Sequence, residues 1–291
     1  MIAPVVKKIA HFALAAICWC GCQSRPGGET VSSVTTPAEL GAAQARASER
    51  NLPLCVLVAE AGASRWDDQA RTALESGGTR DGAGAALALM DLNVSRARAT
   101  AARFHPLETP LFICLSPRGV IVSRDQKPIT RGLILRRVRQ AAEQSPELDA
   151  KLAALKESAD KNKNDPAAQW ALADFFARQQ NALEAIPLLE PIAHSETAET
   201  PLRLRAWVAL GRAHLWIAEP EKARHEAEAM MDTLGARTPE ARAGGELVLG
   251  IGDANLKRAA LARQEFEEAI SAAPDSAYGK QAAEAMAGLP R

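Results

Sequence analysis

The sequence predicts two kinds of domain in one chain: an α/β domain, followed by an all-α domain built of repeated helices. Between residues 37 and 144, short apolar runs alternate with amphipathic segments. This pattern is typical of one sheet whose strands alternate along the chain with the helices that cover it. Further along, Leu172, Leu210 and Leu249 recur 38 and 39 residues apart in similar surroundings, which indicates a helical repeat. The length of 291 residues fits two domains of ordinary size.

The composition excludes binding driven by net charge. Lys plus Arg and Asp plus Glu are 35 each, so the chain has no basic excess for nucleic acid or for an anionic membrane surface. The glycine-rich segment at residues 76–84 lacks the Lys-Ser/Thr pair of a phosphate-binding loop. No two histidines have the i, i+4 spacing of a zinc-binding helix. We therefore expect no nucleic-acid partner, no metal site and no small-molecule cofactor.

The N-terminus has the layout of a secretory signal. Lys7 and Lys8 precede a short apolar run at 9–17, and Gly21 precedes Cys22. The run is too short for a lasting membrane span. Its ending, "GCQS", resembles a bacterial lipoprotein signal, and this resemblance implies that Cys22 is lipidated and becomes the mature N-terminus. Ordinary secretion, and a metal site formed by the three cysteines of "CWCGC", are the alternatives.

The predicted signal segment determines where we expect the protein to be located. Residues 1–22 would be the signal peptide and residues 23–36 a flexible tether rich in Ser, Thr, Gly and Pro. The body of the protein would then be extracytoplasmic, facing the periplasm, and held at a membrane by the lipid on Cys22.

The α/β domain is expected over residues 37–144. A terminal strand hairpin, joined by the turn "SPRG", closes it. The predicted elements are a helix at 37–51, a strand at 54–58, a helix at 64–75, a loop at 77–84, a strand at 85–93, a helix at 96–105, strands at 110–115 and 119–125, and a helix at 130–144.

This stretch resembles a thioredoxin-like domain. The residues that carry the resemblance are the apolar strand 54–58, Asp91 at the end of the second strand, Thr109-Pro110 before the third, and the hairpin "SPRGVIVSRD". In that family the proline at the position of Pro110 is cis and lies against the active-site turn. The resemblance therefore implies a cis-proline surface made of Thr109, Pro110 and the nearby Trp66.

The redox motif of that family is missing. Its C-x-x-C pair should follow the first strand, where this chain reads "AEAGASRWDDQ". Thiol–disulfide exchange needs an activated thiolate and a second thiol that resolves the mixed disulfide. We therefore expect a redox-inactive domain without catalytic residues.

Cys55 and Cys114 lie in two apolar strands that the resemblance makes neighbours. We interpret them as buried free thiols that behave as small apolar side chains. A disulfide is the alternative, which an oxidising compartment would permit.

The C-terminal repeats resemble tetratricopeptide repeats, which are helix–turn–helix units of about 34 residues. The second unit shows the pattern best, with Trp207, Leu210 and Gly211 in its first helix. We expect these repeats at 166–291, including a cap helix at 275–288, and a bridging helix within 145–165 that joins the two domains.

The resemblance implies that the first helix of each unit lines a concave groove. Arg and Trp together suit an extended or helical peptide with an acidic group, because both concentrate binding energy at interfaces. The alternative is that the tryptophans only pack between helices. The candidate groove residues are Trp170, Asp174, Arg178, Arg205, Val208, Arg212, Trp216, Leu247, Ile251 and Asn255.

These features favour a membrane-tethered, non-enzymatic adaptor that binds a protein or peptide partner in the groove. One alternative is a thiol–disulfide or chaperone-type helper that acts through the thioredoxin-like surface. A purely structural part of an envelope assembly is another.

Overall fold

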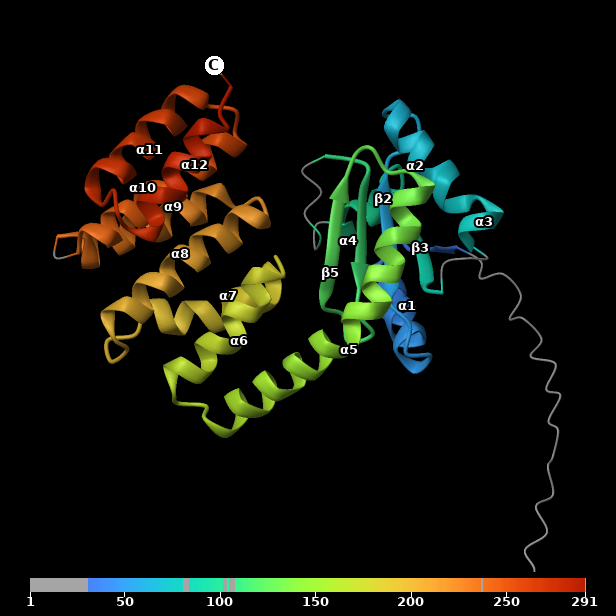
Figure 1. Cartoon of the computed structure of the whole chain (residues 1–291), viewed down its shortest axis with the longest axis horizontal. Coiled ribbons are helices and arrows are strands. Elements are labelled where there is room, and N and C mark those ends of the chain that lie inside the picture. Colours follow the sequence, from blue (N-terminus) through green and yellow to red (C-terminus); the bar gives the residue numbers. More distant parts are fainter. Residues whose placement is uncertain (1–30, 81–83, 102–103, 105–107, 237, 291) are drawn as a thin grey trace, which may run out of the picture.

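The structure is a computed structural model that describes residues 31–80, 84–101, 104, 108–236 and 238–290. It consists of an N-terminal α/β region with a mixed sheet, followed by an all-α region of packed helices (Figure 1). The long helix α5 (Arg131–Lys161) connects the two regions. The predicted succession of an α/β part and an all-α part is therefore confirmed.

The sheet has five strands in the order β1-β3-β2-β4-β5. Strands β1, β3 and β2 are parallel, whereas β4 and β5 run antiparallel to their neighbours. Every residue of β2 is buried, because this strand lies between two others and is covered on both faces. The strands are β1 (Ser32–Ser33), β2 (Leu54–Ala59), β3 (Ala86–Asp91), β4 (Leu111–Leu115) and β5 (Ile121–Gln126).

Helices cover both faces of this sheet. Leu40 and Ala97 belong to the apolar core on one face, and Leu74 and Ile134 to the core on the other. The first half of α5 thus forms part of the α/β region. The other helices of this region are α1 (Pro37–Glu49), α2 (Arg65–Glu75), α3 (Gly77–Arg80) and α4 (Ser95–Ala101).

The expected tether, residues 23–36, requires a correction in its described part. Ser32 and Ser33 pair with β3 as a fifth strand, and the Val34 amide donates to the carbonyl of Leu89 at 3.0 Å. Val34 is only 1% exposed. The burial of Val34 and the hydrogen bonds to β3 hold this short segment in the sheet. Two paired residues are too few for the sequence to predict a strand. Cys22 and the whole segment expected to be a signal peptide, residues 1–22, lie outside the described residues.

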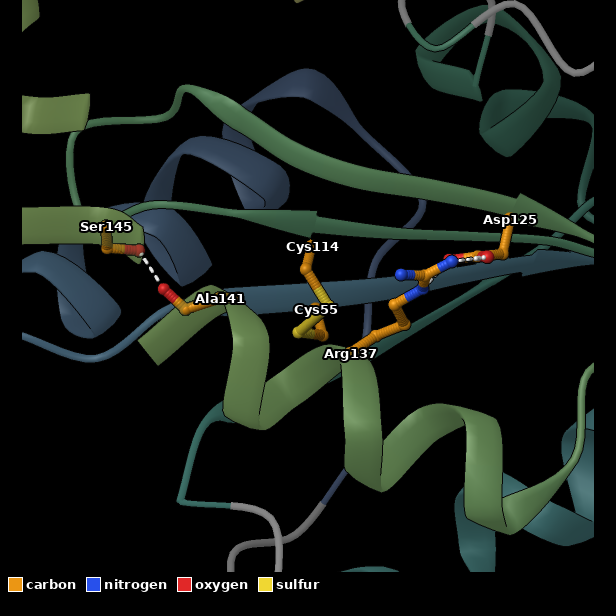
Figure 2. Close-up of a disulfide and its surroundings, with 6 residues drawn as sticks. All are labelled: Cys55, Cys114, Asp125, Arg137, Ala141 and Ser145. Atoms are coloured by element: carbon orange, nitrogen blue, oxygen red, sulfur yellow. Dashed lines mark hydrogen bonds and ion pairs between the residues drawn. A yellow bond between two sulfur atoms is a disulfide. The ribbon is translucent and has the colours of Figure 1, made fainter. Parts of the chain in front are cut away.

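Three elements differ from the predictions by more than two residues. The expected loop at 77–84 contains the short helix α3, and α4 ends at Ala101, with residue 105 outside the described part. The closing and bridging helices are one helix, α5, which continues through Pro146. Just before that proline, the Ser145 hydroxyl donates to the carbonyl of Ala141, four residues back in the same helix (Figure 2). The two regions are therefore joined by a helix rather than by a hinge.

The all-α region consists of three helix pairs and a final helix that packs on the last pair. The pairs stack in chain order, and each helix lies against its sequence neighbours (Figure 1). The helices are α6 (Pro166–Arg178), α7 (Ala182–Ala193), α8 (Thr200–Trp216), α9 (Pro220–Met230) with a π-helical extension at Met231–Gly235, α10 (Pro239–Asn255), α11 (Ala259–Ala272) and α12 (Ala277–Ala287).

The three pairs share one turn geometry. Gln180, Ala218 and Lys257 lie 38 and 39 positions apart and have φ values of 54°, 52° and 62°. In each turn the amide of the following residue donates at 2.9 Å to a carbonyl in the last turn of the first helix. This combination is the common left-handed ending of an α-helix. The periodicity in the sequence therefore corresponds to a repeated backbone structure.

Small residues allow the helices to approach closely. A Cβ atom on Gly211 would lie 2.7 Å from Val248, and one on Gly250 would lie 2.5 Å from the ring of Phe266. Both distances are shorter than ordinary contacts, so these positions require glycine in this packing.

The second half of α5 belongs to the all-α region. Leu152 and Ala159 share a core with the repeats, and that core also includes Val120 from the sheet hairpin. Asp149 on α5 accepts hydrogen bonds from the Ser116 hydroxyl and, at 3.3 Å, from the Arg118 amide. The hairpin between β4 and β5 is thus fixed to the helix that carries the repeats.

Candidate functional site

A groove of about 520 Å³ is lined by residues of α6, α8 and α12. Its residues come from the first helix of each of the first two pairs, from the turn that follows α6 and from the final helix. Seven of the ten predicted groove residues line it: Trp170, Asp174, Arg178, Arg205, Val208, Arg212 and Trp216. The remaining lining residues are Ala177, Gln180, Ala209, Tyr278 and Gln281.

The predicted residues of the third unit lie elsewhere. Ile251 and Asn255 line an adjoining groove of about 400 Å³, which shares Arg212 and Trp216 with the first. Leu247 is 1% exposed and packs with Phe266 and Ala282 in an apolar core. Its predicted place on the groove surface is therefore corrected. The reason is that α12 folds back against α10 and covers this part of the inner face.

Arginine side chains dominate the polar lining of the groove. The Arg205 guanidinium lies 5.4 Å from the centre of the Trp170 ring, a cation–π distance. Arg178 forms an ion pair with Asp174 at 2.7 Å. Arg212 donates to the side-chain carbonyl of Gln281 at 3.1 Å. The carboxylate of Asp174 is thus paired with Arg178, whereas Arg212 donates its hydrogen bond to a neutral amide.

Burial shifts the pKa values of two groups in the groove. Removal from water lowers the pKa of Arg212, partly offset by Tyr278. Burial also raises the pKa of the Tyr278 hydroxyl, while the positive charges of Arg205 and Arg212 oppose this rise. A partly desolvated guanidinium gains more from a carboxylate than a fully hydrated one does. The groove is therefore suited to an anionic group.

Tyr278 and Gln281 were not expected in the groove. Both belong to α12, which the sequence predicts only as a solubilising cap. Tyr278 is the one tyrosine of the chain, and an aromatic residue in such a helix is the signal that could have suggested a role in the groove. Where the helix folds back is a tertiary property that the repeat pattern does not contain.

The second predicted surface lies in the α/β region, around the cis proline. The Thr109-Pro110 bond is cis, as the resemblance implies. Pro110 is buried and Thr109 is partly buried. Trp66 is also partly buried, and the Arg65 guanidinium lies 4.5 Å from the centre of its ring. Since Pro110 is buried, these three residues do not form an open surface.

The turn after β2, where a redox pair would lie, is held by carboxylates. Buried Asp67 accepts from the Glu60 amide at 3.0 Å and from the Ser64 hydroxyl at 2.6 Å. Arg71 of α2 and Asp91, the last residue of β3, form an ion pair at 2.5 Å. Burial alone would raise the pKa of Asp91, but its bonds to Arg71 and to nearby backbone lower it overall. These carboxylates fix the turn.

Cys55 and Cys114 form a disulfide, so the interpretation as free thiols is wrong (Figure 2). They lie directly opposite each other in β2 and β4, with Cα atoms 4.1 Å apart. Both residues have 0% exposure. Beside them, Arg137 of α5 binds both carboxylate oxygens of Asp125 on β5 at 2.7 Å (Figure 2).

Within the described part of the chain, no three His, Cys, Asp or Glu side chains are grouped as metal ligands. Over the same residues, no helix combines the length and the apolar character needed to cross a bilayer. Neither a family model nor a curated protein sequence matches this chain. The groove and its arginines are therefore interpreted from their own geometry.

Proposed function

We propose that this protein is a membrane-tethered extracytoplasmic adaptor whose all-α region binds a peptide segment of a partner protein. In this proposal the α/β region is a redox-inactive thioredoxin-like module and the all-α region is a short tetratricopeptide-like array. The adaptor has no catalytic residues of its own.

Several features support a thioredoxin-like α/β region. Three parallel strands are followed by an antiparallel hairpin, with β2 at the centre and helices on both faces. A cis Thr109-Pro110 bond precedes β4, and Asp91 ends β3. Residues 60–64, which follow β2, contain no cysteine, in agreement with a module that has lost thiol exchange.

The repeated turn supports the tetratricopeptide-like attribution. The three turns lie 38 and 39 residues apart and share both φ values and capping bonds. Gly211 and Gly250 are at equivalent positions, and each lies too close to a neighbouring side chain to carry a Cβ atom.

The observation that carries the binding function is the groove between α6, α8 and α12. It combines Trp170, Trp216 and Tyr278 with Arg205 and the partly desolvated Arg212. Tryptophan, tyrosine and arginine are enriched among the few residues that dominate the binding energy of protein interfaces. The volume of about 520 Å³ suits a few side chains of a peptide rather than a folded surface.

The tether and the location rest on the sequence. The proposed lipid on Cys22 would confine the adaptor, with its bound partner, to a membrane surface. The Cys55–Cys114 disulfide agrees with an oxidising compartment outside the cytoplasm. That disulfide is buried, so attack by a partner thiolate would need the sheet to open, which disfavours the thiol-helper alternative.

The test is crosslinking in intact cells followed by purification of the protein. We expect a discrete set of crosslinked partners with the native chain and its loss in an Arg212→Glu, Trp216→Ala variant. The exposed Arg205→Glu is the second groove variant, and Arg139→Glu, exposed on α5, is the matched control. Circular dichroism and thermal melting establish that each variant is folded.

Two outcomes would contradict the proposal. If the groove variants keep all partners, the groove is only helix packing. If instead a Cys55→Ala, Cys114→Ala variant that remains folded loses the partners while the groove variants keep them, the disulfide helper is the better description.

A further inference from the structure

We propose that the groove lined by α6, α8 and α12 selects its partner segment through one internal acidic side chain, held between Arg205, Arg212 and the Tyr278 hydroxyl. The segment carries a large apolar residue on each side of that acidic residue. This inference rests on the proposed function and names the ligand chemistry of the same groove, whose volume is about 520 Å³.

Three hydrogen-bond donors face one another in this groove. Arg205 and Arg212 are seven residues apart on α8, so both lie on its groove face. Tyr278 and Gln281 lie on one face of α12, from which the Gln281 side chain reaches Arg212 at 3.1 Å. Burial raises the pKa of the Tyr278 hydroxyl, and both guanidinium groups are near enough to oppose this rise. This set of donors matches the acceptor oxygens of a carboxylate.

Within the described part of the chain, neither guanidinium is paired with a carboxylate. Arg205 lies 5.4 Å from the centre of the Trp170 ring and donates to the Pro201 carbonyl at 3.3 Å. Arg212 donates to the side-chain carbonyl of Gln281, which carries no charge. The positive charge of both arginines is therefore left for a ligand to neutralise.

Partial burial increases what Arg212 gains from such a ligand. Removal from water lowers the pKa of Arg212, and Tyr278 partly offsets this effect. A hydrogen bond between two charged groups is shorter and stronger than one to a neutral amide. A carboxylate can therefore replace Gln281 as the partner of Arg212, and the amide nitrogen of Gln281 can then donate to the same carboxylate.

The remaining charges of the groove neutralise each other. Asp174 and Arg178, one helical turn apart on α6, form an ion pair at 2.7 Å. The positive charge without a counter-charge is thus confined to α8. A second acidic side chain placed toward α6 would meet the carboxylate of Asp174, so the groove favours one acidic residue and disfavours an acidic run.

The dimensions of the groove place that residue inside the segment. The lining residues of α8 extend from Arg205 to Trp216, roughly 16 Å at 1.5 Å per residue. Trp216 lies one turn beyond Arg212, and Trp170 lies beside Arg205. The carboxylate position thus has a tryptophan on each side. A segment that fills the groove continues past this position in both directions, and about five extended residues cover its length.

The surfaces on both sides of the carboxylate position suit large apolar side chains. Trp170 and Trp216 are partly buried, so their rings are only partly covered by the protein. Val208 and Ala209 lie between them along α8 and also line the groove. In an extended peptide, residues two positions apart point to the same side. We therefore expect Asp or Glu with large apolar residues two positions before and two positions after it.

The test selects random decapeptides on the intact protein from two display libraries. One library has fixed residues on both sides of the random segment, and the other ends in a free carboxylate. The first should enrich the pattern just described. In fluorescence anisotropy, replacement of the acidic residue by its amide should weaken binding roughly tenfold or more, since a hydrogen bond to a charged group is worth a factor of this size. Amidation of the peptide's C-terminus should change nothing.

Gln281→Glu separates recognition of charge from packing. It places a carboxylate of the chain itself beside Arg212, so it should weaken binding of the acidic peptide roughly tenfold or more. Ala283→Glu adds the same charge at an exposed position on another face of α12, outside the groove, and is the matched control. Tyr278→Phe removes only the hydroxyl and should weaken binding by a smaller factor. Thermal melting establishes that each variant is folded.

The outcomes separate this inference from the proposed function. Enrichment only in the free-carboxylate library, with binding lost on amidation, would overturn the internal position. Equal binding of the amide-substituted peptide, enrichment of neutral or basic sequences, or no enrichment would overturn the selection of a carboxylate. In each case the proposed function still stands if Arg205→Glu loses the crosslinked partners in cells. It fails if no groove substitution alters them.

Discussion

The two regions of this protein are stabilised in different ways. In the α/β region, β2 pairs with strands from distant parts of the chain, and a disulfide joins residues 59 positions apart. The all-α region contains no cysteine, and its helices pack mainly on their sequence neighbours. The first region thus depends on long-range contacts, whereas the second depends on a local unit repeated three times.

This difference has a consequence for binding. A sheet fixed by distant contacts presents a defined surface, and stacked helix pairs produce a curved inner face. The grooves lie where these two surfaces approach each other and along the inner helices. The helix α5 contributes to both cores and connects the two surfaces.

The regions also treat buried charge differently. In the all-α region, Asp253 is 1% exposed and forms ion pairs with Arg224 at 3.4 Å and Arg258 at 3.3 Å. Glu265 of the next helix brings a second carboxylate to this cluster, and its Oε2 atom is buried without a hydrogen-bond partner. A repeat interface that holds two carboxylates should lose stability as the pH rises toward neutrality, whereas the lowered pKa of Asp91 makes the α/β region lose stability only at acidic pH.

The largest expected effect comes from removing the disulfide. A Cys55→Ala, Cys114→Ala variant should lose about 4 kcal/mol of unfolding free energy in the α/β region, because the cross-link closes a long loop of the unfolded chain. Urea unfolding should show this loss in Trp66 fluorescence, read in a background where the other tryptophans are replaced by phenylalanine. The reduced native protein serves as control and should behave as the variant does. An equal loss in the all-α region, read from buried Trp207 in a second background that keeps only that tryptophan, would contradict the separation of the two cores.

The next effect concerns the pH dependence of the all-α region. Burial raises the pKa of Glu265 from 4.5 to about 7, and the negative charge of Asp253 adds to the rise. Because the folded-state pKa is raised, the folded form binds the proton more tightly. The contribution of protonated Glu265 to the unfolding free energy is therefore fully present below pH 4.5 and is lost as the pH rises through about 7. The full shift corresponds to roughly 3.4 kcal/mol at about 1.36 kcal/mol per pKa unit, and the partial solvent exposure of Glu265 reduces the expected loss to about 2 kcal/mol.

A Glu265→Gln variant tests this dependence. It should remove most of the decline in unfolding free energy between pH 4.5 and pH 7.5, measured by urea denaturation at several pH values. Glu267→Gln, an exposed position on the same helix, is the matched control and should leave the decline unchanged. A native protein whose stability is flat over this range would show that the carboxylate pair does not bind a proton there.

The smallest expected effect compares one glycine in each region. Gly250→Ala should destabilise the protein by about 1 to 2 kcal/mol, because the added methyl group would meet the Phe266 ring at 2.5 Å. Gly41→Ala in α1 has nothing within 4 Å and should stabilise by about 0.5 to 1 kcal/mol through helix propensity. Thermal melting of both variants measures the two shifts. Shifts of the same sign would mean that close helix packing does not distinguish the regions.

Much of the fold could be predicted because its signals are local in the sequence. The apolar run at Leu54 predicts a strand buried on both faces, and the recurrence of Leu172, Leu210 and Leu249 predicts helix pairs. The spacing of 38 and 39 residues reappears in the turns at Gln180, Ala218 and Lys257. Seven of the ten groove residues follow from the same counting, because a helical period fixes which side chains share a face.

What the sequence alone determined is therefore the succession of elements and the faces of the inner helices. The tertiary structure decided where distant segments meet. It placed Val34 on the edge of β3, joined Cys55 to Cys114, and folded α12 back so that Tyr278 enters the groove while Leu247 is covered. Side-chain period and propensity act over a few residues, whereas these contacts depend on the packing of the whole chain, which no local pattern encodes.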